Sequence, residues 1–448
     1  MSTIATKPAV NEPAAHEPAM QQRSTRPLNT GRIVVWSVFA VALIVAPMIF
    51  TSSLALTMLS QIGYLIIICL SYNMLLGQGG MLSFGHAVYV GLGSFIAIHT
   101  MNLAAKGSLP VPLVLIPLVG GLGGMFFAVL FGYVSTKKSG TTFAMITLGL
   151  GELVAAMALM FPTFFGGEGG ITTNRVYGMP LFGITFERQN QVYYLIAVYC
   201  FICTGLMFAF TGTPLGRMLN AVRDNPERVE FIGYSTQRVR YFSFIIAGFF
   251  AGIGGGLAAI NFEIVNAADS LNGLRSGGYL LFTFLGGATF FFGPMIGAVL
   301  LVFASVLLSE LSKAWLLYLG LVFLLMVMFA PGGVASLIMM NVRVALFGKF
   351  HRFYALYAGL IVTAAVMVAG AAAIVEMIYH MQLNAALGPT VRLATFELDT
   401  SSPMSWLIAV ALLVVGLALF EVVRRRYVKV WGKAQEEIEF EIKRRETA

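Results

Sequence analysis

The chain has 448 residues, of which 58% are hydrophobic and 11% are charged, and its net charge is +8. Soluble domains carry about 25% charged residues, so this composition excludes a soluble globular protein and indicates a membrane protein with several spans. The 48 glycines fit the same class, because small residues let membrane helices approach one another closely.

Residues 1–32 are polar and rich in proline and alanine, which predicts a disordered cytoplasmic tail. Twelve apolar segments follow, and most of them approach the length of about 20 residues that a membrane span needs. They are 33–50, 54–76, 81–101, 109–134, 142–161, 192–210, 241–260, 277–292, 294–308, 315–330, 354–378 and 404–420. The sequence therefore predicts an all-α polytopic membrane protein. The segments 277–292 and 294–308 are short, which is typical of a broken or re-entrant helix.

Basic residues predict the orientation of these spans. If the N-terminus is cytoplasmic and the twelve segments alternate in direction, 22 of the 28 basic residues fall on the cytoplasmic side. The other six are Lys106, Arg175, Arg188, Arg275, Lys313 and Arg392. Because cytoplasmic loops are enriched in Lys and Arg, we expect both termini to be cytoplasmic. Topology thus explains the net charge, and no nucleic-acid partner is expected.

Glycines interrupt several spans, as in GQGGMLSFGHAVYVGLGSF from Gly77, AGIGGG from Ala251 and LGGATFFFGPMIGA from Leu285. Such interruptions often mark substrate sites in transporters, because broken helices free backbone N–H groups that can hold a carboxylate. The candidate pathway residues in the first run are Gly79, Gly80, Ser83 and His86. Close packing of helices through small residues is the alternative explanation for each glycine.

Glu152, with Gly151 before it, is the clearest acid inside an apolar segment. A charged side chain there costs about 2.5–3.5 kcal/mol on insertion scales, so it needs a partner or an aqueous cavity. Two interpretations stay open: a residue of the translocation pathway, or a structural hydrogen bond within the bundle. Cys200 and Cys203 have CxxC spacing, but no second cysteine or histidine cluster completes a metal site, and the histidines lack ligand spacing. No P-loop or nucleophile motif occurs. We expect no metal, cofactor or catalytic residue on this chain.

The most charged segment between two spans covers residues 216–240, with five arginines and three acids. A short surface helix is predicted within it, since an Asp-Asn-Pro sequence can cap and start a helix. Acidic residues favour the N-terminal end of that helix, and a glycine can end it. The residues of this predicted docking element are Arg223, Asp224, Asn225, Glu227, Arg228, Glu230 and Gly233. An ordinary solvated connector is the alternative.

This segment resembles the EAA loop of ABC importer permeases, because Glu227 and Gly233 have the spacing of its E-A-A-x-x-x-G core. The stretch GRMLNAVRDNPERVEFIG is more similar to the loop of LivM-like permeases of branched-chain amino-acid importers. YNMLLGQGGMLSFGHAVYVGLGSF, FAMITLGLGEL, GGEGGI, GPMIGA and FAPGGV resemble the same family and occur in its order. Two departures are Arg228 and Val229 in place of the two alanines, and ATFFF at 288–292 where the family is usually glycine-rich.

The resemblance implies a permease subunit of an ATP-driven importer in a bacterial inner membrane. Its substrates would be branched-chain or other hydrophobic amino acids, or related small polar solutes. Implied partners are membrane lipid, a second homologous permease, two ATPase subunits that bind ATP and Mg²⁺, and a periplasmic binding protein. The docking element would be the coupling helix seated in an ATPase, and this chain would catalyse no bond chemistry. The alternative is an ion-coupled secondary transporter of small carboxylates, with Glu152 as proton carrier.

Four parts of the chain are expected. The tail 1–32 precedes a permease domain at 33–340, which a C-terminal extension at 341–423 follows with two further transmembrane helices. Residues 424–448 form a charged cytoplasmic tail that can continue as a helix through i,i+4 ion pairs. Because the extension lies beyond the usual end of the family, we expect an accessory role for it in assembly or lipid contact.

Overall fold

The structure is a computed structural model that describes residues 30–177, 185–383, 388–393 and 396–447. Residues 1–29, which hold most of the predicted N-terminal tail, lie outside the described residues. Helices dominate the described part, where the strands form two ribbons of two strands each, so the all-α fold is confirmed. Nine described helices are long and apolar enough to cross a membrane, and one bent pair makes a tenth candidate span.

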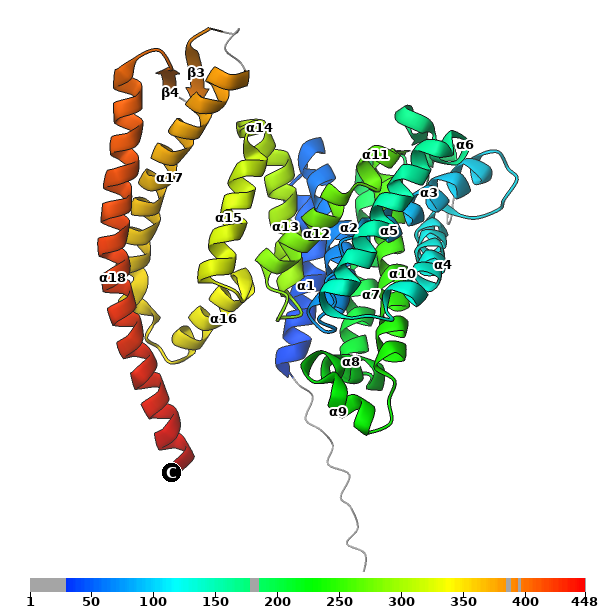
Figure 1. The fold of residues 1–448 in the computed structure, drawn as a ribbon, viewed down its shortest axis with the longest axis horizontal. Helices are drawn as coiled ribbons and strands as arrows, with labels where there is room; N and C mark the ends of the chain where they lie inside the picture. The colour runs from blue at the N-terminus through cyan, green and yellow to red at the C-terminus, as the bar shows by residue number, and fades with distance from the viewer. Residues whose placement is uncertain (1–29, 178–184, 384–387, 394–395, 448) are drawn as a thin grey trace, which may run out of the picture.

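Four helices form the centre of the bundle: α2 (Ser53–Leu76), α3 (His86–Ala105), α4 (Ile116–Ser135) and α10 (Thr236–Phe262) (Figure 1). Small residues set their spacing, since a Cβ atom on Gly252 of α10 would lie 2.4 Å from the carbonyl oxygen of Gly120 on α4. A Cβ atom on Gly255 would lie 2.0 Å from the carbonyl oxygen of Val90 on α3. The AGIGGG run therefore packs an unbroken helix and does not interrupt it, which corrects the expectation above.

Three longer helices surround this centre: α1 (Thr30–Ile49), α5 (Gly140–Met160) and α7 (Gln189–Gly212). Trp36 of α1 packs on α7, with its ring centroid 5.6 Å from that of Phe208. Short elements connect the spans: η1 (Leu113–Leu115), α6 (Pro162–Phe165), η2 (Gly167–Gly169), η3 (Arg175–Tyr177), α11 (Ala267–Ser270), and the antiparallel pair β1 (Ile171–Thr172) and β2 (Ile264–Val265). Only six of the 21 residues of α5 are buried, so one side of this helix is left open.

A helix that does not cross the bundle follows α11. α12 (Gly273–Gly286) has only 14 residues, or about 21 Å at 1.5 Å per residue. The chain then returns through α13 (Gly293–Val302), the π-helical stretch η4 (Phe303–Leu308) and α14 (Ser309–Leu311), which together make a candidate span of 19 residues. The re-entrant element is thus α12, and the second of the two short predicted segments is a span of ordinary length.

The termini of the helices lie at two opposite ends of the bundle. Figure 1 shows the start of α1, the helices α8 (Pro214–Asp224) and α9 (Pro226–Phe231), and the end of α18 (Pro403–Thr447) at one end. The opposite end holds α11, α14 and the antiparallel ribbon of β3 (Thr390–Leu393) and β4 (Phe396–Asp399). Both described ends of the chain therefore lie at the same end of the bundle. That this side is cytoplasmic remains a prediction.

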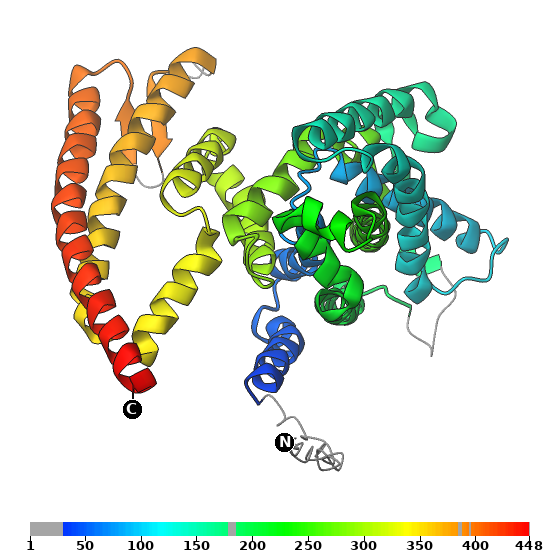
Figure 2. The same cartoon turned by 60° about the horizontal axis from the view of Figure 1, so that its bottom comes forward.

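The C-terminal part is a long hairpin of α17 (Tyr354–Leu383) and α18, which is continuous over 45 residues (Figure 2). It is joined to the bundle by α15 (Trp315–Phe329), α16 (Gly333–Leu346) and η5 (Phe350–Phe353). The predicted divisions at 340 and 423 both lie inside helices, α16 and α18. Several side-chain contacts fasten the hairpin; among them, Tyr318 donates to Glu376 at 3.2 Å, and Tyr357 donates to Asn341.

Candidate functional site

The break between α2 and α3 is the first candidate region. Gly80 has a φ of +62°, a left-handed conformation that glycine adopts without strain, and α3 begins only at His86. The N–H groups of Gly79 and Gly80 donate to the carbonyl oxygens of Leu75 and Leu76 at 3.1 and 3.0 Å. Neither N–H group is therefore available to a carboxylate, and the reason for placing these two glycines in the pathway is lost.

Ser83 and His86 in the same break are fully buried. The hydroxyl of Ser71 donates to the Ile68 carbonyl at 2.7 Å, so its oxygen accepts from His86 Nε2, which lies 2.9 Å away. In the neutral ring Nδ1 is then an acceptor. Both His86 Nδ1 and Ser83 Oγ are buried without a hydrogen-bond partner among the described residues. An unsatisfied buried polar atom costs about 1–3 kcal/mol, so two of them in one break are unusual for a purely structural element.

Three elements hold this break in place. Tyr72 on α2 donates to the Ser83 carbonyl at 2.9 Å, and the Phe84 N–H donates to Thr147 on α5 at 3.1 Å. The Ala87 N–H donates to Ser276 on α12 at 3.0 Å. The backbone of the break is thus tied to the re-entrant helix and to α5. The sequence carried no signal for Thr147 and Ser276 as partners, since both are distant along the chain, whereas Tyr72 lies only 11 positions before Ser83.

Gly151 and Glu152 are neighbours on α5 but face different surroundings. Gly151 is buried, and a Cβ atom on it would lie 3.6 Å from the Cα of Gly85. It therefore allows α5 to pack on the α2–α3 break. Glu152 is exposed, and no hydrogen bond or ion pair is recorded for it among the described residues. The structural hydrogen bond proposed for Glu152 is thus not supported.

Glu152 lies at an open hollow of about 340 Å³ between α5 and the starts of α11 and α12. A Cβ atom on Gly273 would lie 3.1 Å from Glu152 Oε1, so the carboxylate sits over the first turn of α12, where the helix dipole favours negative charge. The other lining residues are Ala155, Ala156, Leu159, Ala267, Ala268 and Asn272. One carboxylate among small apolar side chains can bind an ammonium group that carries a hydrophobic substituent.

The docking element folds largely as predicted. Asn225 caps α9 by accepting the Arg228 N–H at 3.0 Å, Pro226 is its first residue, and Gly233 follows it with a φ of +88°. Glu230 accepts a hydrogen bond from the Thr236 hydroxyl at 2.8 Å. It therefore fixes α9 to α10, whereas Glu227 remains exposed.

Two features of this region were not predicted from the sequence. The first is α8, which precedes α9. The sequence did carry a signal for its start, because the Thr213 hydroxyl caps the helix and Pro214 is its first residue. Apolar side chains also protrude beside the charges: Phe231 is 88% exposed, Ile232 65% and Tyr234 53%. Exposed clusters of this kind mark interaction surfaces.

Arg223 connects the docking element to the α2–α3 break. Its guanidinium donates to the carbonyl oxygen of Gly77 at the end of α2 and pairs with Asp224 at 2.9 Å. Gly80 lies against the same side chain, since a Cβ atom there would be 2.9 Å from Arg223 Cγ. The structure thus joins two groups of predicted residues that are more than a hundred positions apart in the sequence.

Comparisons with known proteins agree with this architecture. Residues 54–331 match the family model described as the branched-chain amino acid transport system / permease component. The chain is 25% identical over 292 residues to the high-affinity branched-chain amino acid transport system permease protein LivM of Escherichia coli (strain K12), which covers 60% of this chain and 67% of that protein. LivM of Salmonella typhimurium is 26% identical with the same coverage. No solved structure matches the chain.

A more distant relative is the probable branched-chain amino acid transport permease protein LivH of Methanocaldococcus jannaschii. It is 24% identical over 256 residues, or 52% of this chain and 80% of that protein. The family match begins at α2 and ends just before α16. The α2–α3 break, Glu152 and the docking element all lie within it, whereas α16, α17 and α18 lie outside.

Proposed function

Because this chain belongs to the branched-chain amino acid transport system permease family, we propose that it is the membrane-spanning subunit of an ATP-driven importer of branched-chain or similar hydrophobic amino acids. The matched region holds the break, the hollow and the docking element. The relatives are transport permeases, so the alternative of an ion-coupled secondary transporter has no support from them. ATP and Mg²⁺ would bind on partner ATPase subunits and not on this chain.

The observation that carries the proposal is the docking element with its protruding apolar tip. Phe231 and Ile232 stand beyond the charged residues of α9, and exposed aromatic anchors surrounded by polar groups are typical of protein interfaces. We place an ATPase subunit on this tip. Since Arg223 ties the same region to Gly77, a movement of α9 would reach the break that holds Ser83 and His86.

The open side of α5 would face a second, homologous permease. Met145 and Met160 on α5 are 69% and 75% exposed, and Glu152 lies on the same helix with no partner among the described residues. A carboxylate inside a membrane needs a partner or water, so a protein interface that encloses an aqueous path suits it better than lipid. In this path the Glu152 hollow would attract the ammonium group of an amino acid. A periplasmic binding protein would deliver the substrate at the end of the bundle that holds α11.

The test is assembly and transport of the whole complex in a bacterial inner membrane. The chain would be expressed with its partner subunits, purified through a tag and reconstituted with the binding protein and labelled leucine. We expect ATPase chains to copurify and ATP-dependent leucine uptake to follow. Phe231→Ser should remove the ATPase chains, whereas Leu311→Ser, which changes a 73% exposed side chain at the opposite end, should retain them. Uptake without ATP, driven by an ion gradient, would overturn the proposal.

A further inference from the structure

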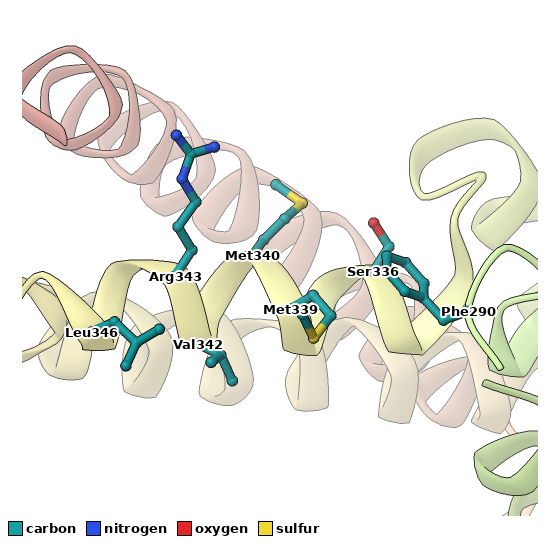
Figure 3. A pocket seen from close by; sticks show the side chains of 7 residues that line it. All are labelled: Phe290, Ser336, Met339, Met340, Val342, Arg343 and Leu346. Atoms are coloured by element: carbon teal, nitrogen blue, oxygen red, sulfur yellow. The ribbon is translucent and has the colours of Figure 1, made fainter. Parts of the chain in front are cut away.

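An open hollow of about 440 Å³ runs along α16, and all of its lining residues except Phe290 lie outside the part of the chain that matches the family. Its walls are mainly apolar and include Phe290, Met339, Met340 and Leu346. Met340 is 43% exposed and Leu346 is 81% exposed. Figure 3 shows Phe290 reaching the hollow beside Ser336, so the turn after the re-entrant helix forms one end of it.

The hollow lies beside a sharp bend between two helices. α16 is bent by 50° from α15 at a short break, and Gly333 allows the bend through a φ of +69°. Figure 1 places α16 toward the same end of the molecule as α8 and α9. A bend of this kind at the end of a span would bring α16 along the interface, with its side chains at the level of the lipid headgroups.

Arg343 supplies a cation to this hollow. Figure 3 shows its side chain on the same side of α16 as Met340 and Ser336. No hydrogen bond or ion pair of its guanidinium is recorded within the described ranges, whereas nearby Lys349 lies 3.0 Å from Glu437 and Arg352 lies 3.1 Å from the same carboxylate. A guanidinium without an acid is suited to a phosphate group, which it can bind through two parallel hydrogen bonds.

We infer that this hollow binds an anionic phospholipid, with its phosphate at Arg343 and an acyl chain along Met340, Ser336 and Phe290. An unpaired cation beside apolar walls complements a molecule that has a phosphate at one end and hydrocarbon at the other. A soluble anion would leave the methionines exposed to water, and a neutral lipid would leave the guanidinium unpaired. Because Phe290 belongs to the family bundle and Arg343 to the added helix, the lipid would join these two parts. The inference does not depend on the transported substrate.

The test is lipid retention by the full chain in native mass spectrometry. The protein in a mild detergent is given phosphatidylglycerol and phosphatidylcholine in equal amounts, and the bound lipids are counted. We expect preferential retention of phosphatidylglycerol. Arg343→Ala should lower its apparent affinity roughly tenfold or more, as expected for loss of a charge-assisted contact, while retention of phosphatidylcholine stays unchanged. Arg238→Ala, which removes another exposed arginine at the same end of the bundle, is the matched control and should behave like the wild type.

A second variant tests the apolar part of the hollow. Ser336→Phe keeps every charge but fills the space beside Phe290, so it should reduce retention of phosphatidylglycerol by a similar factor. The inference is overturned if Arg343→Ala and Arg238→Ala retain phosphatidylglycerol equally. It is also overturned if Ser336→Phe binds as the wild type does, or if a polypeptide and no lipid is found in the hollow.

Discussion

The guanidinium of Arg223 donates a hydrogen bond to the backbone carbonyl of Gly77. Arg223 lies in the last turn of α8, beside the proposed ATPase contact, and Gly77 is the C-cap of α2, where the interrupted stretch begins. A side chain bound to a backbone carbonyl at a helix end also satisfies an acceptor that the helix leaves open. The contact therefore joins a surface loop to the interior of the bundle through one residue.

Arg223→Ala should separate ATP hydrolysis from transport. The protruding tip of α9 is unchanged in this variant, so ATPase chains should still copurify. Losing a hydrogen bond from a charged group costs about 1.5–3 kcal/mol, so uptake per ATP hydrolysed should fall roughly tenfold or more. The measurement is leucine uptake and phosphate release on the same proteoliposomes. Arg217→Ala, which changes an exposed arginine of the same helix, is the control, and equal uptake ratios in the two variants would contradict the link.

Substitutions of Gly233 test the role of the backbone conformation in docking. Its φ is +88°, and no atom lies within 4 Å of the position that a Cβ would take. A replacement therefore meets no clash, and its cost comes from the left-handed conformation, about 1–2 kcal/mol for an ordinary residue. Copurification of the ATPase chains should decrease in the order glycine, asparagine, alanine, valine. Full recovery with Gly233→Val would show that the turn has no role in docking.

Glu152→Gln should lower amino-acid uptake by about tenfold, because the amide loses the charge that would attract an ammonium group. Collapse of the proton gradient should leave wild-type uptake unchanged while ATP is supplied. Glu310→Gln removes an exposed acid at the same end of the bundle and should have little effect. Wild-type uptake in Glu152→Gln would remove this carboxylate from the pathway, and sensitivity of the wild type to the proton gradient would restore the proton-carrier interpretation.

The sequence predicted those features that arise from neighbouring residues. The start, cap and end of α9 depend on Asn225, Pro226 and Gly233, which are close together in the chain. The apolar lengths likewise predicted the helices, since a span is a local property. Contacts between distant segments were not predictable: nothing in the local pattern indicates that Arg223 meets Gly77. Gly79 and Gly80 are a different case, because their N–H groups bond locally to the carbonyl oxygens of Leu75 and Leu76. They were expected to be free because a glycine run was expected to interrupt the hydrogen bonding of the helix.

Removing the C-terminal extension should leave measurable transport. The family match ends at residue 331, and the hairpin is fastened to the preceding helices by the contacts of Glu376 with Tyr318 and of Tyr357 with Asn341. A chain that stops after Gly348 keeps α16 and loses both hairpin helices. We expect it to insert, bind the ATPase chains and take up leucine at a reduced rate. Normal insertion and assembly with no uptake would assign the hairpin a central role.

Acid should release the end of α18 from the loop that precedes α17. Hydrogen bonding to Lys349 holds the pKa of Glu437 below its usual value. The Glu437 carboxylate therefore stabilises its contact with Lys349 at pH values above about 4.3, the usual pKa of an unfolded glutamate. This stabilisation is lost as the pH falls through the lowered pKa of Glu437. Trp431, whose ring centroid is 5.6 Å from Tyr427, reports the change when it is the only tryptophan left. Its emission should shift below about pH 4, and Lys349→Met should weaken this pH dependence, since Arg352 still pairs with Glu437.

α18 is much longer than a membrane is thick. Its 45 residues form one unbroken helix with a length of about 67 Å, and the hydrocarbon layer of a bilayer, about 30 Å, covers less than half of it. The tip of the helix lies about 35 Å beyond the bilayer. If the helix tilts by about 10° within the membrane, this tip moves by roughly 6 Å. Small rearrangements of the hairpin are thus magnified outside the bilayer, where a spin label can detect them. The ion pairs of Lys349 with Glu437 and Glu441 restrict the movement of this end of α18.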